Sequence, residues 1–218
     1  MTGPIIALIG GTGKLGAALA RRLAKAGGRV VIGSRSAENA QRIAAELGFG
    51  LEGLSNAAAA ARADLIIVTV PFAAQEATLA EIAPHAAEKI VVDTTVPLMP
   101  PKVMRVQLPP EGSAALRAQS LLGDRVKLVS AFHNVAAHKL MTDEDIDCDV
   151  LVFGDDRDAR AAVIALAEAA GLRGLHGGAL ANSAAAEAMT SVLIFMNKCY
   201  RVDGAGLRIT GALSEAAG

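Results

Sequence analysis

A glycine-rich stretch near the start of the chain has the spacing of a dinucleotide-binding turn. An apolar run at residues 5–9 leads into Gly10 and then into Gly11-Thr12-Gly13-Lys14-Leu15-Gly16, which reads GxGxxG. The first glycine of this pattern permits a tight turn, the second lets a pyrophosphate approach the backbone, and the third lets a helix pack on a strand. The free N–H groups at the start of that helix attract phosphate. We therefore predict a dinucleotide site over residues 11–16.

The end of the next predicted strand indicates which dinucleotide binds. An NAD site usually carries Asp or Glu there, because a carboxylate accepts hydrogen bonds from the ribose hydroxyls. This chain has Gly33-Ser34-Arg35 instead. A guanidinium beside a hydroxyl suits the 2′-phosphate of NADP, which a carboxylate would repel, and Thr12 offers a second hydroxyl. We predict NADP; the alternative for Arg35 is an ordinary solvated arginine.

Other predicted strand ends carry further candidate residues. Ligands of doubly wound sheets bind outside the carboxyl ends of the strands. Val70 and Pro71, at the end of the strongest strand signal, are therefore expected near the nicotinamide. His133 and Asn134 follow a later strand, and His133 is placed to hydrogen-bond a carbonyl or ring nitrogen of a substrate. A histidine that only orders its loop explains His133 equally well.

The sequence lacks the residue patterns that several other catalytic chemistries require. His138 lies five positions after His133, which is poor spacing for two metal ligands on one helix face, so we expect no metal site. No HExxH, P-loop or Ser-His-Asp arrangement is present. Asp155-Asp156 is typical of a turn into a helix, and the acidic stretch 143–145 of a solvated loop.

Strands and helices alternate through the part of the chain that must position these residues. Strands are predicted at 5–9, 29–33, 50–54, 65–70, 90–92 and 126–131, and helices at 14–26, 36–48, 56–62 and 73–86. The alternation implies βαβ units and a doubly wound, mostly parallel α/β sheet of the Rossmann type. Five of the eight prolines lie between Val96 and Pro110, so that stretch is expected to be an ordered loop.

The pattern changes near residue 142. A strand at 149–153 and helices at 158–170 and 182–200 follow. We predict an NADP-binding domain at 1–142 and a small C-terminal α+β lobe at 143–218, with a single merged unit as the close alternative.

Composition excludes several classes of protein. The 218 residues carry a net charge of −1 with no block of like charges, so nothing predicts binding to nucleic acid or an anionic membrane. Cys148 and Cys199 have no CxxC spacing, and no basic segment precedes the first apolar run. The apolar stretches are too short to span a bilayer. We expect a cytoplasmic protein.

Six motifs, in order along nearly the whole chain, resemble those of the NADPH-dependent coenzyme F420 reductases, also called F420H2:NADP oxidoreductases. The motifs occupy residues 9–16, 31–35, 130–135, 148–156, 178–182 and 206–209. The first is generic, whereas the last four together are fairly specific.

The resemblance implies hydride exchange between the nicotinamide of NADP and the deazaflavin ring of F420. It also implies that Thr12, Ser34 and Arg35 hold the 2′-phosphate. Some members of the family add a lysine where this chain has Asn39, so one phosphate contact is expected to be absent.

Hydride transfer mainly requires the two rings to be stacked at reactive distance. Polar groups at His133 and Asn134, the candidate catalytic residues, would face charge that develops on the deazaflavin. Small and aliphatic residues would form the flat cleft, partly from the C-terminal lobe: Val70, Pro71, Val135, Ala136, Ala137 and Leu207.

Two alternatives remain open at this point. One is another NADP-linked reductase of the same fold, acting on imines, hydroxy acids or ferric iron; the other is a non-catalytic NADP sensor. The resemblance also implies a homodimer. The apolar helical stretch 184–195 is explained equally well as its interface or as core.

Overall fold

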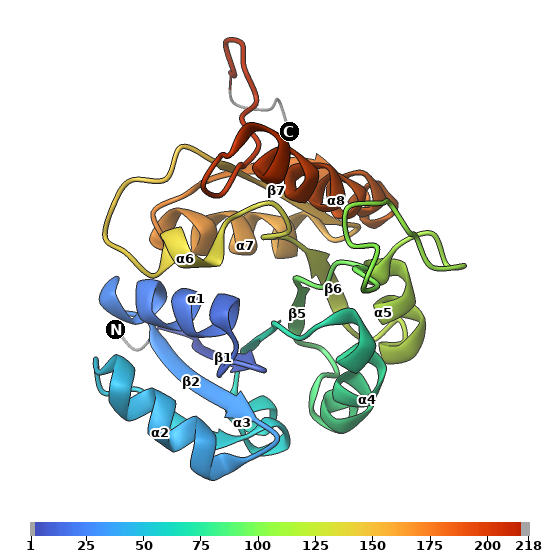
Figure 1. Ribbon diagram of the computed structural model, residues 1–218. Coiled ribbons are helices and arrows are strands. Elements are labelled where there is room, and N and C mark those ends of the chain that lie inside the picture. The colour runs from blue at the N-terminus through green and yellow to red at the C-terminus, as the bar shows by residue number, and fades with distance from the viewer. Residues whose placement is uncertain (1–2, 215–218) are drawn as a thin grey trace.

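One central sheet organises the molecule (Figure 1). The computed structural model describes residues 3–214, so the two predicted domains extend beyond it at the chain ends. The eight strands lie in the order β3-β2-β1-β4-β5-β6-β7-β8. Their bounds are β1 Ile5–Ile9, β2 Arg29–Ser34, β3 Glu52–Ser55, β4 Leu65–Val68, β5 Ile90–Asp93, β6 Lys127–Ser130, β7 Asp149–Gly154 and β8 Arg173–Gly178. Neighbouring strands are parallel except for β6 and β7, which confirms the predicted mostly parallel α/β fold.

Helices cover both faces of this sheet. Their bounds are α1 Lys14–Lys25, α2 Ala37–Leu47, α3 Asn56–Arg62, α4 Phe72–Ile82, α5 Ala114–Leu122, α6 Ala137–Leu140, α7 Arg157–Ala169 and α8 Ser183–Tyr200, with short 3₁₀ turns at Ala83–His85 and Leu180–Asn182. One buried cluster joins α1, α2 and α7 to the sheet, and a second joins α3, α4 and α5 to the opposite face. The chain is therefore doubly wound.

Strand β2 shows why the strands are continuously apolar. Val30 and Ile32 belong to the cluster under α1, whereas Val31 belongs to the cluster on the other face. Because successive side chains of a strand point to opposite faces, a strand covered on both sides has to be apolar throughout.

Local signals set several helix ends where they were predicted. The hydroxyl of Ser36 accepts a hydrogen bond of 3.1 Å from the N–H of Asn39 at the start of α2. Gly48 ends that helix with φ of 78°, a conformation that favours glycine. The Asp156 carboxylate accepts the N–H of Ala159 and starts α7, as expected of a turn into a helix.

Three elements escape the sequence pattern, and the shortest of them, α6, has only four residues. Helix α5 directly follows residues 94–113, which form neither helix nor strand. Strand β8 has the sequence RGLHGG, and glycines weaken a strand signal. At Gly177 a Cβ would stand 2.3 Å from the Phe153 ring, so the glycine permits this part of β8 to lie close to β7.

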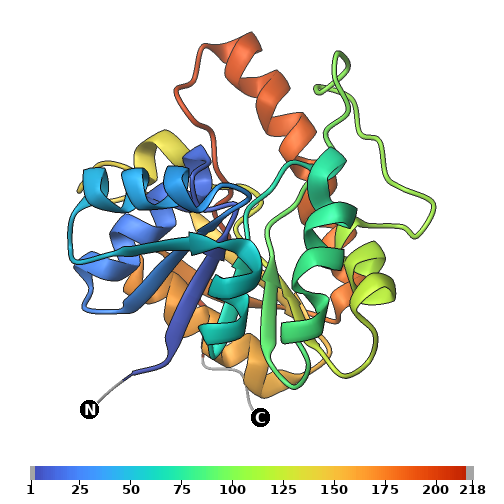
Figure 2. The ribbon, with the colours of Figure 1, turned by 90° about the horizontal axis from the view of Figure 1, so that it is seen from below.

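The C-terminal part of the chain continues the same sheet through β7 and β8. Figure 2 shows α8 extending beyond the sheet alongside the loop that precedes α5. A domain boundary at residue 142 stays a prediction. None of the helices within residues 3–214 is long and apolar enough to cross a membrane.

Arg22 joins α1 to this C-terminal part. Its guanidinium donates to the carbonyls of Leu140 at 3.0 Å, Glu144 at 2.8 Å and Ala170 at 3.2 Å. Leu140 and Ala170 lie at the ends of α6 and α7, where carbonyl groups lack partners within the helix. The arginine satisfies them and fixes both helix ends against α1.

Candidate active site

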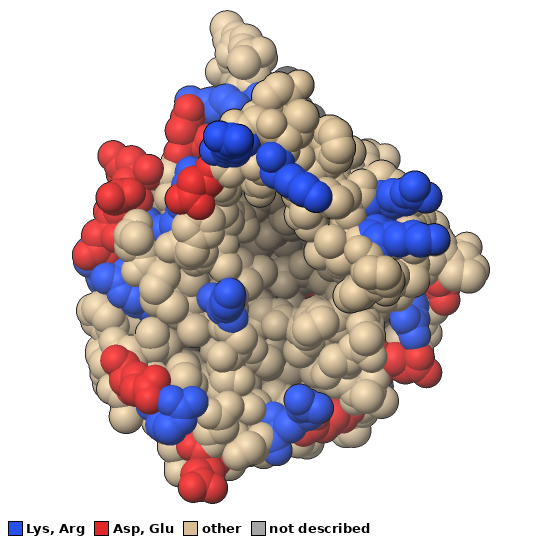
Figure 3. Space-filling view, viewed as in Figure 1, with Lys and Arg blue, Asp and Glu red and all other residues tan. Residues whose placement is uncertain are grey.

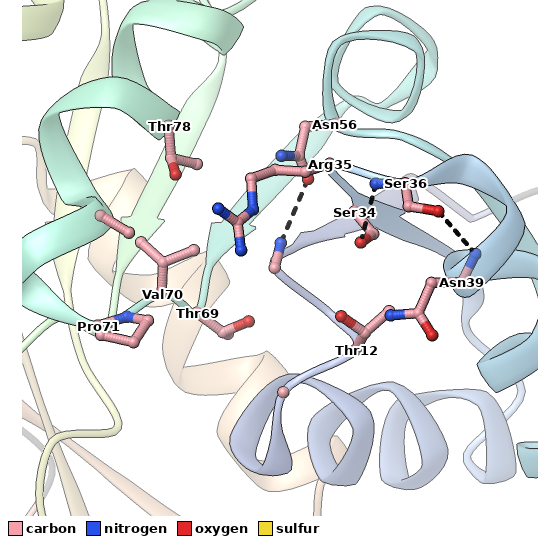
Figure 4. A pocket seen from close by; sticks show the side chains of 13 residues that line it. Thr12, Ser34, Arg35, Ser36, Asn39, Asn56, Thr69, Val70, Pro71 and Thr78 are labelled. Carbon is pink, nitrogen blue, oxygen red and sulfur yellow. Dashed lines mark hydrogen bonds between the residues drawn. The ribbon is translucent and has the colours of Figure 1, made fainter.

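The first cleft lies where the strand order reverses, at the carboxyl ends of β1, β2 and β4 (Figure 4). Its volume is about 530 Å³, and its lining residues are Gly10, Thr12, Gly13, Ser34, Arg35, Ser36, Asn39, Asn56, Thr69, Val70, Pro71, Ala74 and Thr78. This switch point is where doubly wound sheets bind nucleotides.

Glycines allow α1 to approach the end of β4. A Cβ on Gly16 would stand 2.5 Å from the Thr69 hydroxyl oxygen and 2.7 Å from the Cα of Gly11. Gly10 has φ of +72°, and a Cβ there would stand 2.5 Å from Val70. Side chains at positions 10 and 16 would therefore push the glycine turn away from β4.

Gly13 differs from these packing glycines. It lines the cleft, and the nearest atom to a Cβ built on it is 3.4 Å away. It is also the N-cap of α1, where no side chain caps the helix and the first turn holds no acidic residue. The free N–H groups of this turn and the space beside Gly13 fit the pyrophosphate of a dinucleotide.

Polar groups gather at one end of the same cleft. Figure 4 shows Thr12, Ser34, Ser36 and Asn39 together there, while Arg35 reaches across the middle. Within residues 3–214, no carboxylate pairs with Arg35. This set fits a phosphate on the ribose 2′ position, because hydroxyls donate hydrogen bonds and the guanidinium supplies charge.

Asn39 lies where a family lysine was expected. Its side-chain oxygen accepts a hydrogen bond of 2.8 Å from Arg42. That contact leaves the amide N–H₂ group as the donor that Asn39 can offer to the cleft.

A second cleft, of about 390 Å³, lies between the loop after β6, α6, α8 and the segment after α8. Its lining residues are His133, Asn134, Val135, Ala136, His138, Thr190, Leu193, Ile194, Asn197, Val202, Asp203, Gly204 and Ala205. Since β1 to β6 are parallel, this loop leaves the sheet at the same edge as the first cleft.

His133 is buried and uncharged at neutral pH. Burial lowers its pKa to about 4, and its Nε2 lies 2.8 Å from the hydroxyl oxygen of Ser130. A neutral imidazole can hold a polar substrate group by hydrogen bonding but does not offer a positive charge.

Asn134 connects the same loop to α8. Its amide donates to the Ala186 carbonyl at 2.9 Å and to the Thr190 hydroxyl at 3.1 Å. The Thr190 hydroxyl in turn donates to the His133 carbonyl at 3.2 Å. Phe132 precedes the loop in the left-handed region, with φ of 64°, a strained conformation for a large side chain.

Not every predicted residue lines a cleft. Val70 and Pro71 line the first cleft, and Val135 lines the second with His133 and Asn134. The predicted residues outside both linings are Gly11, Lys14, Leu15, Gly16, Ala137 and Leu207. Leu207 instead pairs with β7, where its carbonyl accepts the N–H of Asp149 at 2.7 Å.

Sequence reasoning missed a buried polar network behind the clefts. The Asp93 carboxylate, at the end of β5, accepts hydrogen bonds from Thr95 and Gln75, both at 2.6 Å. Burial raises its pKa to about 6. The Thr95 hydroxyl oxygen also lies 3.4 Å from the Val70 carbonyl oxygen. Asp93 therefore orients Thr95 beside the backbone of the first cleft. The signal that the sequence offered for this network was the position of Asp93 directly before Thr94 and Thr95.

Glu187 was missed as well. This buried residue of α8 accepts the N–H groups of Ala114 at 2.6 Å and Ala115 at 3.1 Å, at the start of α5. Burial raises its pKa to about 7 despite these bonds. The carboxylate thus joins α8, which forms one wall of the second cleft, to α5. Only the fold brings these residues together.

The fold and the first cleft define a dinucleotide-binding protein of the Rossmann type. A family described as "NADP oxidoreductase coenzyme F420-dependent" matches residues 5–97. The F420-dependent NADP reductase of Methanothermobacter thermautotrophicus is 41% identical over 218 residues, which cover 94% of each chain. The chain belongs to the family of F420-dependent NADP reductases, as its motifs predicted.

Solved structures agree with this placement. A protein from Arthrobacter sp. FB24, provisionally assigned as an F420-dependent NADP reductase, superposes with a TM-score of 0.85 at 26% identity, covering 96% of this chain and all of that one. An imine reductase from Bacillus cereus reaches a TM-score of 0.66 at 18% identity, over 90% of this chain and 62% of its own length. The second likeness shows the fold alone.

The raised pKa of Glu187 predicts a pH-dependent stability. A carboxyl group whose folded pKa, about 7, exceeds its ordinary 4.5 favours folding at low pH, and this contribution is lost as pH rises through 7. Urea unfolding between pH 5 and 8 should therefore show Glu187→Gln gaining stability relative to the wild type as pH rises. Glu111→Gln, at an exposed position before α5, is the control and should parallel the wild type. A pH-independent difference for Glu187→Gln would contradict the assignment.

Proposed function

We propose that this protein is an oxidoreductase that transfers a hydride between NADP(H) and coenzyme F420. The observation that carries the proposal is a cleft suited to NADP in a chain 41% identical, over 94% of its length, to an F420-dependent NADP reductase. The substrates are two small-molecule cofactors, and each has a cleft at the same edge of the sheet.

In the first cleft, α1 and Gly13 would hold the pyrophosphate of NADP. Ser34, Arg35 and Thr12 would hold the 2′-phosphate. Asn39 would make a weaker contact with this phosphate than a lysine would. Val70 and Pro71 would support the nicotinamide, because they close the cleft beside β4. Gly11 and Gly16 act indirectly, through the packing that sets the turn.

In the second cleft, His133 and Asn134 would orient the deazaflavin. NADPH supplies the hydride when its nicotinamide lies against that ring, so the protein mainly has to align the two. His133 would hydrogen-bond a polar ring atom as a neutral imidazole, while Asn134 keeps the loop on α8. Val135 offers apolar surface to the ring, and Ala137 and Leu207 would support that wall from behind.

Other reductases of the same fold fit less well. Imine reductases share the fold at 18% identity, and the match covers 62% of the imine reductase chain. A non-catalytic NADP sensor does not account for a second cleft lined by His133 and Asn134.

Turnover tests the proposal directly. When the protein is mixed with NADPH and oxidised F420, we expect equimolar oxidation of one and reduction of the other, followed at both absorption bands. The protein with either cofactor alone is the control. Tight NADPH binding with no absorbance change would point to a sensor or to another substrate.

Arg35 should discriminate NADP from NAD. Loss of a charged hydrogen bond to phosphate costs about 1.5–3 kcal/mol, so Arg35→Ala should raise the KM for NADPH roughly ten- to a hundredfold. The KM for NADH should change little, because NADH has no 2′-phosphate. Arg157→Ala, at another exposed arginine, should leave both values unchanged. Equal increases for NADH and NADPH would show that Arg35 is merely structural.

A homodimer is the second part of the proposal. Val192, Phe195, Met196 and Tyr200 are exposed along one side of α8, with Phe195 52% accessible. Exposed apolar stripes of this kind are typical of protein interfaces. We expect a dimer in sedimentation experiments, dissociated by Phe195→Glu but not by Leu121→Glu on α5. A monomeric wild type would contradict it.

A cytoplasmic location is proposed with it. Cys148 and Cys199 are both free thiols, which suits a reducing compartment.

A further inference from the structure

Four cations form a group without acidic partners on the face that carries the cleft. They are Lys102 and Arg105, in the loop before α5, and Lys198 and Arg201, at the end of α8; we call them the basic rim. All four are exposed. Within residues 3–214, none is within ion-pair distance of a carboxylate, whereas Arg62, Arg125 and Lys127 each have one.

A hydrogen bond connects the two elements that carry the halves of the basic rim. The Ser191 hydroxyl of α8 donates to the Arg105 carbonyl at 3.2 Å, which holds the loop against the helix. Ile194 and Asn197 line the cleft. Lys198 follows Ile194 by four residues, so it continues the cleft side of α8, and Arg201 is the residue that ends the helix.

Figure 3 shows the result on the surface. Lys and Arg side chains surround the central hollow, including over the end of α8 and over the neighbouring loop, while Asp and Glu lie mainly toward the margins. The loop at 96–110 contains no acidic residue. The one acidic residue of α8, Glu187, is buried against α5. Asp203, just beyond the helix, lines the second cleft, and its carboxylate lies 2.9 Å from Nε2 of His138.

We propose that the basic rim binds the anionic side chain of the deazaflavin substrate. This inference rests on the proposed function. The first cleft has its own candidate phosphate-binding groups in α1, Ser34 and Arg35, whereas the lining of the second cleft contains no lysine or arginine. A chain of phosphate and carboxylate groups leaving a ring in the second cleft would pass over the end of α8 toward the loop, where positive charges attract it.

Two forms of the substrate separate the rim from the ring site. The test compares coenzyme F420, whose side chain carries phosphate and carboxylates, with a ribityl deazaflavin that has the same ring and an uncharged side chain. NADPH is the reductant throughout. The variant is Lys102→Gln/Arg105→Gln/Lys198→Gln/Arg201→Gln. The control is Arg157→Gln, whose arginine starts α7 after the antiparallel strand β7, at the opposite edge of the sheet.

The rim variant should raise the KM for F420 by about three- to tenfold, since exposed ion pairs are individually weak. Its KM for the ribityl deazaflavin and for NADPH should match the wild type, as should all values for Arg157→Gln. Added salt should raise the wild-type KM for F420 and affect the variant less.

Three results would overturn the assignment. Equal KM values for F420 in variant and wild type would show that the rim binds nothing on this substrate. A matching rise in the KM for the ribityl deazaflavin would show damage to the cleft. A rise in the KM for NADPH would show that the rim binds NADPH instead. A wild type that reduces neither deazaflavin would instead refute the proposed function, and the rim with it.

Discussion

The close approach of α1 to the end of β4 is the constraint on which the rest of the site depends. Gly16 and Gly10 have no room for a side chain against Thr69 and Val70. Their packing brings the first turn of α1 to the point where the strand order reverses. The proposed pyrophosphate donors and the proposed nicotinamide support are thereby fixed relative to each other before any ligand binds, which lowers the cost of ordering them.

The second cleft depends on a different set of contacts, all made by α8. Glu187 holds the start of α5, Asn134 holds the loop after β6, and Ser191 holds the proline-rich loop. Each is a buried or half-buried polar contact between segments far apart in sequence. Such contacts are costly when left unpaired, so they favour one arrangement of the helix over others. The same helix that walls the cleft also carries half of the basic rim and the apolar stripe.

The sequence predicted what local patterns encode. Apolar runs located the strands up to β7, Ser36 and Gly48 located the ends of α2, and GxGxxG with Ser34-Arg35 located the first cleft. The rest depends on distant partners. The Glu187 carboxylate caps α5 from 73 residues away, and β8 is held by close glycine packing on β7. Leu207 was expected to line the cleft. Its carbonyl accepts the N–H of Asp149 in β7 instead, and no spacing in the sequence reveals this contact.

In the proposed reaction both cofactors are held together so that a hydride passes directly between them. The most direct measurement uses NADPH deuterated on the nicotinamide carbon that donates the hydride, with mass spectrometry of the reduced F420 after a single turnover. NADPH labelled on each face in turn covers both stereochemical outcomes. One of the two labels should be transferred stoichiometrically to the deazaflavin ring. Loss of the deuterium to solvent with both labels, or reduction of neither sample, would contradict it.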